Sequence, residues 1–300
     1  MKEAYLAVVN PAAGGGRGKK LIGPALDRLR ASGIAVDVQE TTAQGQGSQI
    51  TRDAWSHGYR RFIAVGGDGT SYEIVNGLFP REASAEPASL AFLPLGTGNS
   101  FLREFSNRGV EHALEAILAR RQQPCDVLRL RHAEGTLHYI NLLSMGFAAD
   151  VATLRARRFS GWGELGYQSA IFVTLARFRR RPFPLRVDGH GEVDRRPCLF
   201  LTFNNSKYTG GTMLIAPKAE VNDGLIEYVR WGPIGRLGLI RNLPTLYDGT
   251  HILHPLAERH SARQIDFFLD GPVDVMVDGE VLTLQCQRLD VLPSALNVVV

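Results

Sequence analysis

Short apolar runs of strand length alternate with amphipathic stretches over the first part of the chain. Apolar residues recur at helical spacing over residues 19–32, where Gly33 ends the pattern, and a second helical stretch covers residues 50–57. A third follows the glycines at 66 and 67 and continues to about Leu78. This alternation predicts an α/β domain with a doubly wound, mostly parallel sheet. The runs of strand length are residues 4–10, 34–38, 62–65 and 89–93.

Strand-length runs become frequent beyond about residue 126, and they predict a second domain that is a mostly antiparallel β-sandwich. Among these runs are residues 127–131 and 138–143, and two helical stretches, about 150–181 and about 233–247, interrupt the series. The change in pattern divides the chain into domains of residues 1–125 and 126–300. No long linker separates them, so we expect the domains to pack closely around a cleft. A return of the last segment to the first domain stays open.

The composition fits a folded protein and restricts the function only weakly. Hydrophobic residues make up 44% of the 300 residues and charged residues 21%. A net charge of +4 is compatible with an anionic substrate, an anionic membrane or nucleic acid. No zinc-finger, RNP-type or leucine-zipper pattern supports nucleic acid, and none is expected as a partner.

The lack of a recognisable targeting signal and the small number of cysteines both favour a cytoplasmic location. Residues 1–10 are too short and too quickly polar for a signal peptide, and apolar stretches such as 169–176 fall short of the roughly 20 residues that cross a bilayer. Cys125, Cys198 and Cys286 are few and far apart, as expected of small buried residues in a reducing compartment.

The segment Gly66-Gly67-Asp68-Gly69-Thr70 carries the strongest chemical signal. Glycines at the end of a strand let backbone N–H groups approach an anion, and the following helix adds its positive end, so the segment suits a phosphate. An aspartate among phosphates indicates a divalent cation. The alternative is a tight turn with Asp68 as helix N-cap.

Two further glycine-rich turns, residues 10–16 and 94–100, follow other strands. Either turn alone is explained equally well by ordinary loop chemistry. Because ligands of parallel sheets bind outside the carboxyl ends of the strands, three such turns together favour a nucleotide site.

These motifs, in their order, resemble the diacylglycerol kinase catalytic family, which includes bacterial lipid kinases and sphingosine kinases. The Gly-Gly-Asp-Gly segment alone is shared with NAD kinases and phosphofructokinases, whereas the ordered set covers nearly the whole chain. The set consists of Asn10-Pro11, residues 66–70, residues 94–99, Asp126, residues 144–150, residues 222–224 and Asp278-Gly279-Glu280.

The resemblance implies ATP as co-substrate and Mg²⁺ as the metal. It implies that Glu280 is the general base, that Asp278 assists it, and that Asp68 takes part in catalysis. Metal binding is implied for Asp68 and Asp126, with Asp223 in a loop that can hold a second, structural metal. The implied nucleotide contacts are Asn10, Pro11, Ala12, Ala13, Gly14, Thr41 (or Thr42), Gly66, Gly67, Asp68, Gly69, Thr70, Ser71, Tyr72, Thr97 and Asn99.

The sequence departs from the bacterial members of the family at Ser100, where they usually carry aspartate. Sphingosine kinases also lack that aspartate, and in their branch an aspartate matching Asp150 reads the lipid head group. The resemblance therefore implies a lipid kinase acting on diacylglycerol or a related glycerolipid, with a sphingoid base as the other acceptor. An enzyme like NAD kinase and a non-catalytic lipid-binding regulator stay open as alternatives.

Arginines and aromatic residues share the segment 150–181. Such a mixture suits peripheral contact with an anionic membrane, although a solvated arginine face over packed aromatics would look the same. The sequence leaves open whether the protein forms a homodimer.

Overall fold

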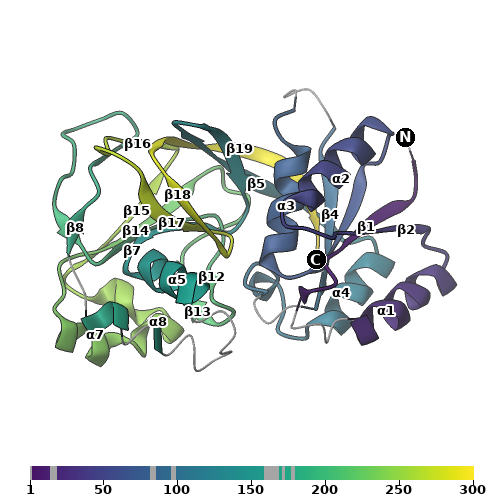
Figure 1. The fold of residues 1–300 in the computed structure, drawn as a ribbon, viewed down its shortest axis with the longest axis horizontal. Helices are drawn as coiled ribbons and strands as arrows, with labels where there is room; N and C mark the ends of the chain where they lie inside the picture. The colour runs from purple at the N-terminus through teal and green to yellow at the C-terminus, as the bar shows by residue number, and fades with distance from the viewer. Residues whose placement is uncertain are drawn as a thin grey trace.

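The computed structural model describes residues 2–13, 19–81, 86–95, 99–158, 169–170, 173–176 and 180–300, the side chains of 19–21 and 156 excepted. Gly14 and Thr97, two of the expected nucleotide contacts, lie outside these residues. The chain forms two lobes that lie side by side (Figure 1). No described helix is long and apolar enough to cross a membrane.

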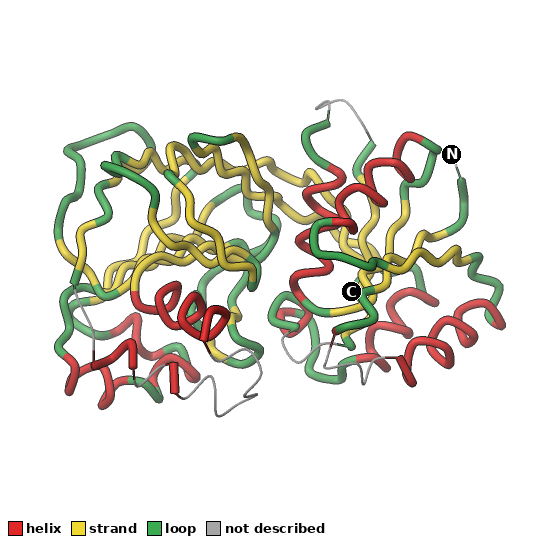
Figure 2. The backbone as a smooth tube through the Cα atoms, viewed as in Figure 1, coloured by secondary structure: helices red, strands yellow, loops and turns green. Residues whose placement is uncertain are grey.

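The first lobe is built on a parallel sheet with strand order β2-β1-β3-β4. Helices α1 and α4 lie on one face of this sheet and α2 and α3 on the other (Figures 1 and 2), which confirms the expected doubly wound domain. Its elements are β1 (Tyr5–Val9), α1 (Lys19–Ala31), β2 (Val36–Glu40), α2 (Gln46–Ser56), β3 (Arg61–Gly66), α3 (Asp68–Leu78), β4 (Ala88–Pro94), η2 (Leu102–Glu104) and α4 (Val110–Leu118).

Burial explains why these segments form strands and helices. All five residues of β1 are buried, as a strand covered on both faces requires. Strand β2 begins two residues later than its apolar pattern suggests, because Ile34 closes α1: its N–H donates to Leu29 O while Gly33 takes a φ of 80°.

The second lobe contains an antiparallel six-stranded sheet with the order β15-β14-β11-β7-β17-β18. A buried apolar layer that includes Tyr139, Phe203 and Ile265 separates it from strands β5, β6, β9, β16 and β19, and this confirms the expected antiparallel domain. Its strands are β5 (Gln122–His132), β6 (Gly135–Tyr139), β7 (Leu142–Gly146), β8 (Arg181–Pro182), β9 (Leu185–Val187), β10 (Pro197–Cys198), β11 (Phe200–Asn204), β12 (Tyr208–Thr209), β13 (Met213–Leu214), β14 (Ile226–Trp231), β15 (Ala257–Ala262), β16 (Gln264–Phe267), β17 (Val273–Val277), β18 (Glu280–Leu284) and β19 (Cys286–Val299).

The helices of the second lobe gather beneath the six-stranded sheet (Figure 2). They include α5 (Phe147–Arg158), α7 (Arg236–Asn242), α8 (Thr245–Asp248) and η3 (Thr250–Leu253), and residues 169–170 and 173–176 are also helical. The helical stretch expected over 233–247 is thus two helices, with Pro244 at the N-cap of the second. The stretch expected over 150–181 starts earlier, at Phe147, and its last residue, Arg181, belongs to strand β8. Residues 159–168, 171–172 and 177–179 within it lie outside the described chain.

Two long strands run through both lobes (Figure 1). Strand β19 pairs antiparallel with β5 along its length, and its last residues, Leu296–Val299, pair parallel with β4 of the first sheet. The boundary expected between residues 125 and 126 therefore falls inside the continuous strand β5. The lobes are joined by a hydrogen-bonded ribbon as well as by the covalent chain.

Asp126 lies on this ribbon and is fully buried. Its Oδ1 accepts a 2.7 Å hydrogen bond from Ser294 N, and its Oδ2 accepts a 2.6 Å bond from Gly224 N. Ser294 has a φ of 50° and lies where the β5–β19 register shifts. Its N–H therefore has no partner in the hydrogen-bond ladder between the two strands. The carboxylate of Asp126 replaces the missing partner.

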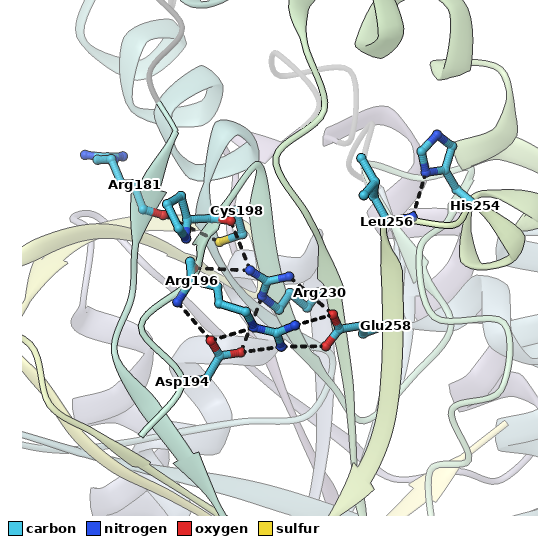
Figure 3. Close-up of polar contacts among 9 residues, drawn as sticks. Arg181, Asp194, Arg196, Cys198, Arg230, His254, Leu256 and Glu258 are labelled. Carbon is cyan, nitrogen blue, oxygen red and sulfur yellow. Dashed lines mark hydrogen bonds and ion pairs between the residues drawn. The ribbon is translucent and has the colours of Figure 1, made fainter. Parts of the chain in front are cut away.

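A cluster of two arginines and two acidic residues lies at the edge of the six-stranded sheet (Figure 3). Arg230, whose side chain is 4% exposed, lies 3.6 Å from carboxylate oxygens of both Asp194 and Glu258. Arg196 donates to the same two carboxylates at 2.7–3.0 Å. The two positive and two negative charges neutralise one another, which lets a buried guanidinium persist in the sheet.

We expect Asp126→Asn to lower the free energy of unfolding by about 2–4 kcal/mol, because an amide cannot accept both charge-assisted bonds and its NH₂ would face an N–H donor. The measurement is urea unfolding of the ligand-free protein. Asp223→Asn is the matched control: its exposed carboxylate accepts one bond, from Leu225 N, and a loss below about 1 kcal/mol is expected. Equal stability of the two variants would contradict a structural role for Asp126.

Candidate active site

The carboxyl ends of β1 and β3 lie next to each other in the sheet. The strand order reverses here, because β2 follows β1 on one side whereas β3 and β4 lie on the other. Asn10 N donates to Val65 O at 3.0 Å, and Asn10 Oδ1 accepts a bond from Ala12 N. Thr41 N donates to Val9 O at 2.8 Å, so Thr41 joins the same edge of the sheet. Three of the segments expected to contact a nucleotide are therefore brought together.

The turn from β3 into α3 leaves no room for side chains at two of its glycines. A Cβ on Gly66 would lie 2.2 Å from Thr70 Oγ1, and a Cβ on Gly69 would lie 2.6 Å from Glu280 Oε1. Thr70 Oγ1 itself is buried and has no hydrogen-bond partner among the described residues. A buried hydroxyl without a partner, at the positive end of a helix, fits an incoming phosphate oxygen.

Asp68 is the first residue of α3 and reaches toward the loop after β4. Its Oδ2 accepts a 3.0 Å bond from Ser100 N, and Phe101 N lies 3.5 Å from its Oδ1. Burial raises the pKa of Asp68 to about 6, and these N–H donors only partly oppose that effect. A divalent cation beside the carboxylate would offset the cost of burying its charge, so the residue suits Mg²⁺ shared with phosphate oxygens.

Asp278 anchors the turn between β17 and β18. Its buried carboxylate accepts three backbone bonds, from Ile140 N, Asn141 N and Leu142 N, at 2.9–3.1 Å. These bonds take the N–H groups that a continuous strand over 138–143 would need, and the expected strand is instead two, β6 and β7. Burial raises the pKa of Asp278 to about 7 against the effect of the three donors.

Glu280 starts β18 and lies against Gly69 of the first lobe. Gln44 Nε2 donates to its Oε2 at 2.9 Å, and burial raises the pKa of Glu280 above its ordinary value. The neighbouring Gly279, at a φ of 88°, brings the turn close to Asp68: a Cβ there would be 3.9 Å from Asp68 Cβ. The two expected catalytic turns, one from each lobe, therefore meet.

A cavity of about 570 Å³ opens from this meeting point into the second lobe. Asp68, Ser100 and Glu280 supply acidic and polar groups at the junction of the lobes. The remaining wall is largely apolar and comes from α5, β11, β13, α7 and α8. It includes Phe147, Phe200, Met213, Leu239, Leu243 and Leu246. One end of the cavity can thus hold reacting polar groups while the rest excludes water.

Ser100 occupies a buried position between the lobes. Besides its N–H bond to Asp68, its Oγ accepts a 2.9 Å bond from Gly211 N of the second lobe. The serine therefore connects Asp68 to the loop between β12 and β13, and it lines the cavity without adding a negative charge.

Several expected site residues do not join this group. The carboxylate of Asp126 is occupied by backbone N–H groups, and Asp223 lies in the loop that supplies one of them. Within the described chain no three His, Cys, Asp or Glu residues come together as a ready-made metal site. Asp150 forms an ion pair with Arg181 and is not among the cavity residues. Its role in reading the head group stays a prediction.

Gln44 is a site residue that sequence reasoning missed. It lies just beyond Thr41 and Thr42, after the carboxyl end of β2, on the edge of the sheet where ligands bind. That placement was a usable signal, but its contact with Glu280, 236 residues away, depends on the packing of the two lobes.

Two family models match the chain, one over most of each lobe. Residues 4–130 match the family model of the diacylglycerol kinase catalytic domain, and residues 141–300 match that of the YegS C-terminal NAD kinase beta sandwich-like domain.

Similar proteins include kinases from two organisms. The "Diacylglycerol kinase" of Mycobacterium tuberculosis (strain ATCC 25618 / H37Rv) is 27% identical over 299 residues, covering 97% of this chain and 93% of that protein. The "Probable lipid kinase YegS-like" of Enterobacter sp. (strain 638) is 26% identical over 283 residues, covering 93% and 91%.

A crystal structure of a diacylglycerol kinase from Bacillus anthracis str. Sterne shares the fold, with a TM-score of 0.70 at 19% identity over 99% of this chain and 96% of that one. Both family models match in sequence order, and the second alone spans more than half of the chain. The chain therefore belongs to the family of lipid kinases that includes the diacylglycerol kinases and the YegS-like kinases.

Proposed function

We propose that the protein transfers the γ-phosphate of ATP, with Mg²⁺, to a hydroxyl of a membrane lipid, diacylglycerol or a related glycerolipid. The observation that carries this proposal is the position of Glu280. It lies against the Gly66–Thr70 turn at the polar end of an apolar cavity, where a phosphate donor and a lipid hydroxyl can meet.

Glu280 is suited to act as the general base. A lipid hydroxyl is a weak nucleophile at neutral pH, and a carboxylate within hydrogen-bonding reach can take its proton as it attacks phosphorus. Gln44 occupies Oε2 of Glu280, and Oε1 faces Gly69 of the phosphate turn. The raised pKa makes the carboxylate a better proton acceptor than an ordinary glutamate.

The first lobe would hold the nucleotide. Asn10, Thr41 and the Gly66–Thr70 turn form one edge of the sheet, and the unpartnered hydroxyl of Thr70 can donate to a phosphate oxygen. Asp68 is the residue that would hold Mg²⁺. The metal would neutralise charge on the phosphates, which is the main requirement of phosphoryl transfer.

Asp278 serves as a positioning residue in this scheme. Its carboxylate is committed to three backbone donors and is buried beneath the turn, so it fixes the direction in which Glu280 points. The apolar wall of the cavity favours acyl chains over a nucleotide acceptor such as NAD, because a charged acceptor would lose its hydration there without replacement bonds.

The direct test is transfer of label from γ-labelled ATP into lipid. We expect label in diacylglycerol or a related glycerolipid presented in mixed micelles, with sphingosine tested in parallel. Glu280→Gln should lower kcat by about 10²–10⁴-fold because the proton acceptor is lost, while ATP binding by calorimetry is kept.

Glu258→Gln is the matched control for this substitution. Glu258 belongs to the ion cluster at the sheet edge and is not among the cavity residues, so kcat should stay near that of the unaltered protein. Unchanged kcat in Glu280→Gln would exclude Glu280 as the base. Label in no lipid, with ATP bound, would overturn the proposed function.

The pH dependence of kcat/KM offers a second test. The ionised form of Glu280 is the active one, so activity should fall as pH falls through its raised pKa. The Gln44 N–H stabilises the ionised carboxylate and lowers that pKa. Gln44→Leu should therefore move the acidic limb of the profile to higher pH.

If the acidic limb of the profile stays in place in Gln44→Leu, that limb reports the titration of a group other than Glu280. Asp68 and Asp278 are the candidates, since burial raises their pKa values to about 6 and about 7. Gln49→Leu serves as the matched control, because Gln49 is exposed and donates to Asp53 and not to Glu280.

A further inference from the structure

The exposed apolar side chains of this protein are concentrated in one short segment. Seven large apolar residues of the described chain are exposed, and five of them lie between residues 237 and 256. Scattered single residues of this kind are ordinary, whereas a contiguous group marks an interaction surface. The five residues are Leu237 (84% exposed), Leu253 (78%), Tyr247 (55%), Ile240 (48%) and Leu256 (41%). We call them the apolar patch.

Helix α7 has two apolar faces with different surroundings. Leu239 is 2% exposed and lines the cavity, as does Leu243 one turn later. Leu237 and Ile240 point away from the cavity into solvent. The segment therefore forms a wall with the cavity on one side and the apolar patch on the other.

The segment is firmly attached to the lobe, so its exposure does not come from fraying. The buried ring of His251 places Nε2 3.0 Å from Ile215 O and Nδ1 3.2 Å from Thr245 O. Leu256 N donates to His254 Nδ1 at 3.1 Å, as Figure 3 shows, which closes the turn before β15. The leucines of the patch are thus held outward on an anchored scaffold.

Tyr247 connects the patch to the cavity. It lines the cavity and is 55% exposed, so the cavity reaches the surface within the patch. A lipid chain leaving a bilayer at this surface would meet an apolar path toward Glu280 without crossing water.

The charges around the patch are mainly positive. Arg236 and Arg241 lie on α7, and Arg180 reaches its start, since a Cβ on Gly235 would be 3.5 Å from Arg180 Nη2. Residues 232–256 contain a single acidic residue, Asp248. Exposed leucines flanked by arginines suit the boundary between head groups and acyl chains of an anionic bilayer.

We propose that the apolar patch is the surface by which the protein docks on an anionic lipid bilayer, with the cavity opening directly into the membrane. The docking itself is independent of catalysis; the passage of an acceptor lipid through this opening rests on the proposed function. The membrane contact expected for residues 150–181 stays a prediction, and residues 159–168, 171–172 and 177–179 of that stretch lie outside the described chain.

The test is flotation with vesicles of phosphatidylcholine mixed with phosphatidylglycerol, without ATP or diacylglycerol. The double variant Leu237→Glu, Leu253→Glu should lower the vesicle partition coefficient at least about ten-fold, because two charges replace two inserting side chains. The side chains of Leu237 and Leu253 are largely exposed to solvent, so the thermal stability of the protein should not change. The matched control is Val38→Glu, Phe268→Glu, which alters the two large apolar residues that are exposed outside the patch in the described chain, and it should float like the unaltered protein.

Insertion of the patch into the bilayer can be detected directly with the variant Leu253→Trp. Its fluorescence should be quenched by vesicles with brominated acyl chains, whereas Val38→Trp should show only the quenching of the unaltered protein. Phosphorylation of diacylglycerol in vesicles should fall in the double variant, while that of a short-chain diacylglycerol in detergent micelles should be kept.

Three results would overturn the docking proposal: unchanged flotation of the double variant, no added quenching in Leu253→Trp, or a dimer that the double variant dissociates without vesicles. The last would show that a second copy covers the patch. Flotation contains no ATP, so it can succeed while label transfer fails, and the two proposals are judged separately.

Discussion

The active site depends on the buried carboxylate of Asp278. Three backbone N–H groups at residues 140–142 point into the interior between β6 and β7, and leaving them without partners would cost several kcal/mol. Asp278, at a φ of 45°, satisfies all three at once. This arrangement fixes the β17–β18 turn against the first lobe, and Glu280, two residues further on, is thereby directed at Gly69.

Environment separates the acids of this site into different roles. Asp278 is saturated with backbone donors beneath the turn, whereas Asp68 and Glu280 each keep oxygen atoms toward the cavity. Burial raises the pKa values of all three carboxyl groups, because removal from water disfavours their charged forms. Such crowding suits a site that receives positive charge, because a cation or a proton would relieve the excess negative charge.

The ribbon of β5 and β19 determines how the two lobes are placed. A linker would leave the Asp68 and Glu280 turns free to separate, but two strands paired across both lobes hold them in contact. Asp126 belongs to this ribbon, where it supplies the acceptor that the register shift at Ser294 requires. An aspartate that resembles a metal ligand in sequence can thus be needed first for the backbone.

The sequence by itself determined the two domain types and the glycine turns at strand ends, because hydrophobic period and turn chemistry are local properties. It indicated the Asp278–Glu280 pair only through the resemblance of its ordered motifs to a known family. Tertiary structure alone decided the break between β6 and β7, the contact of Gln44 with Glu280, and the return of β19 beside β4. It also decided that α7 shows one apolar face to the cavity and another to solvent. Each of these joins residues far apart in the chain, and no local pattern encodes which distant atoms will satisfy a donor or cover an apolar face.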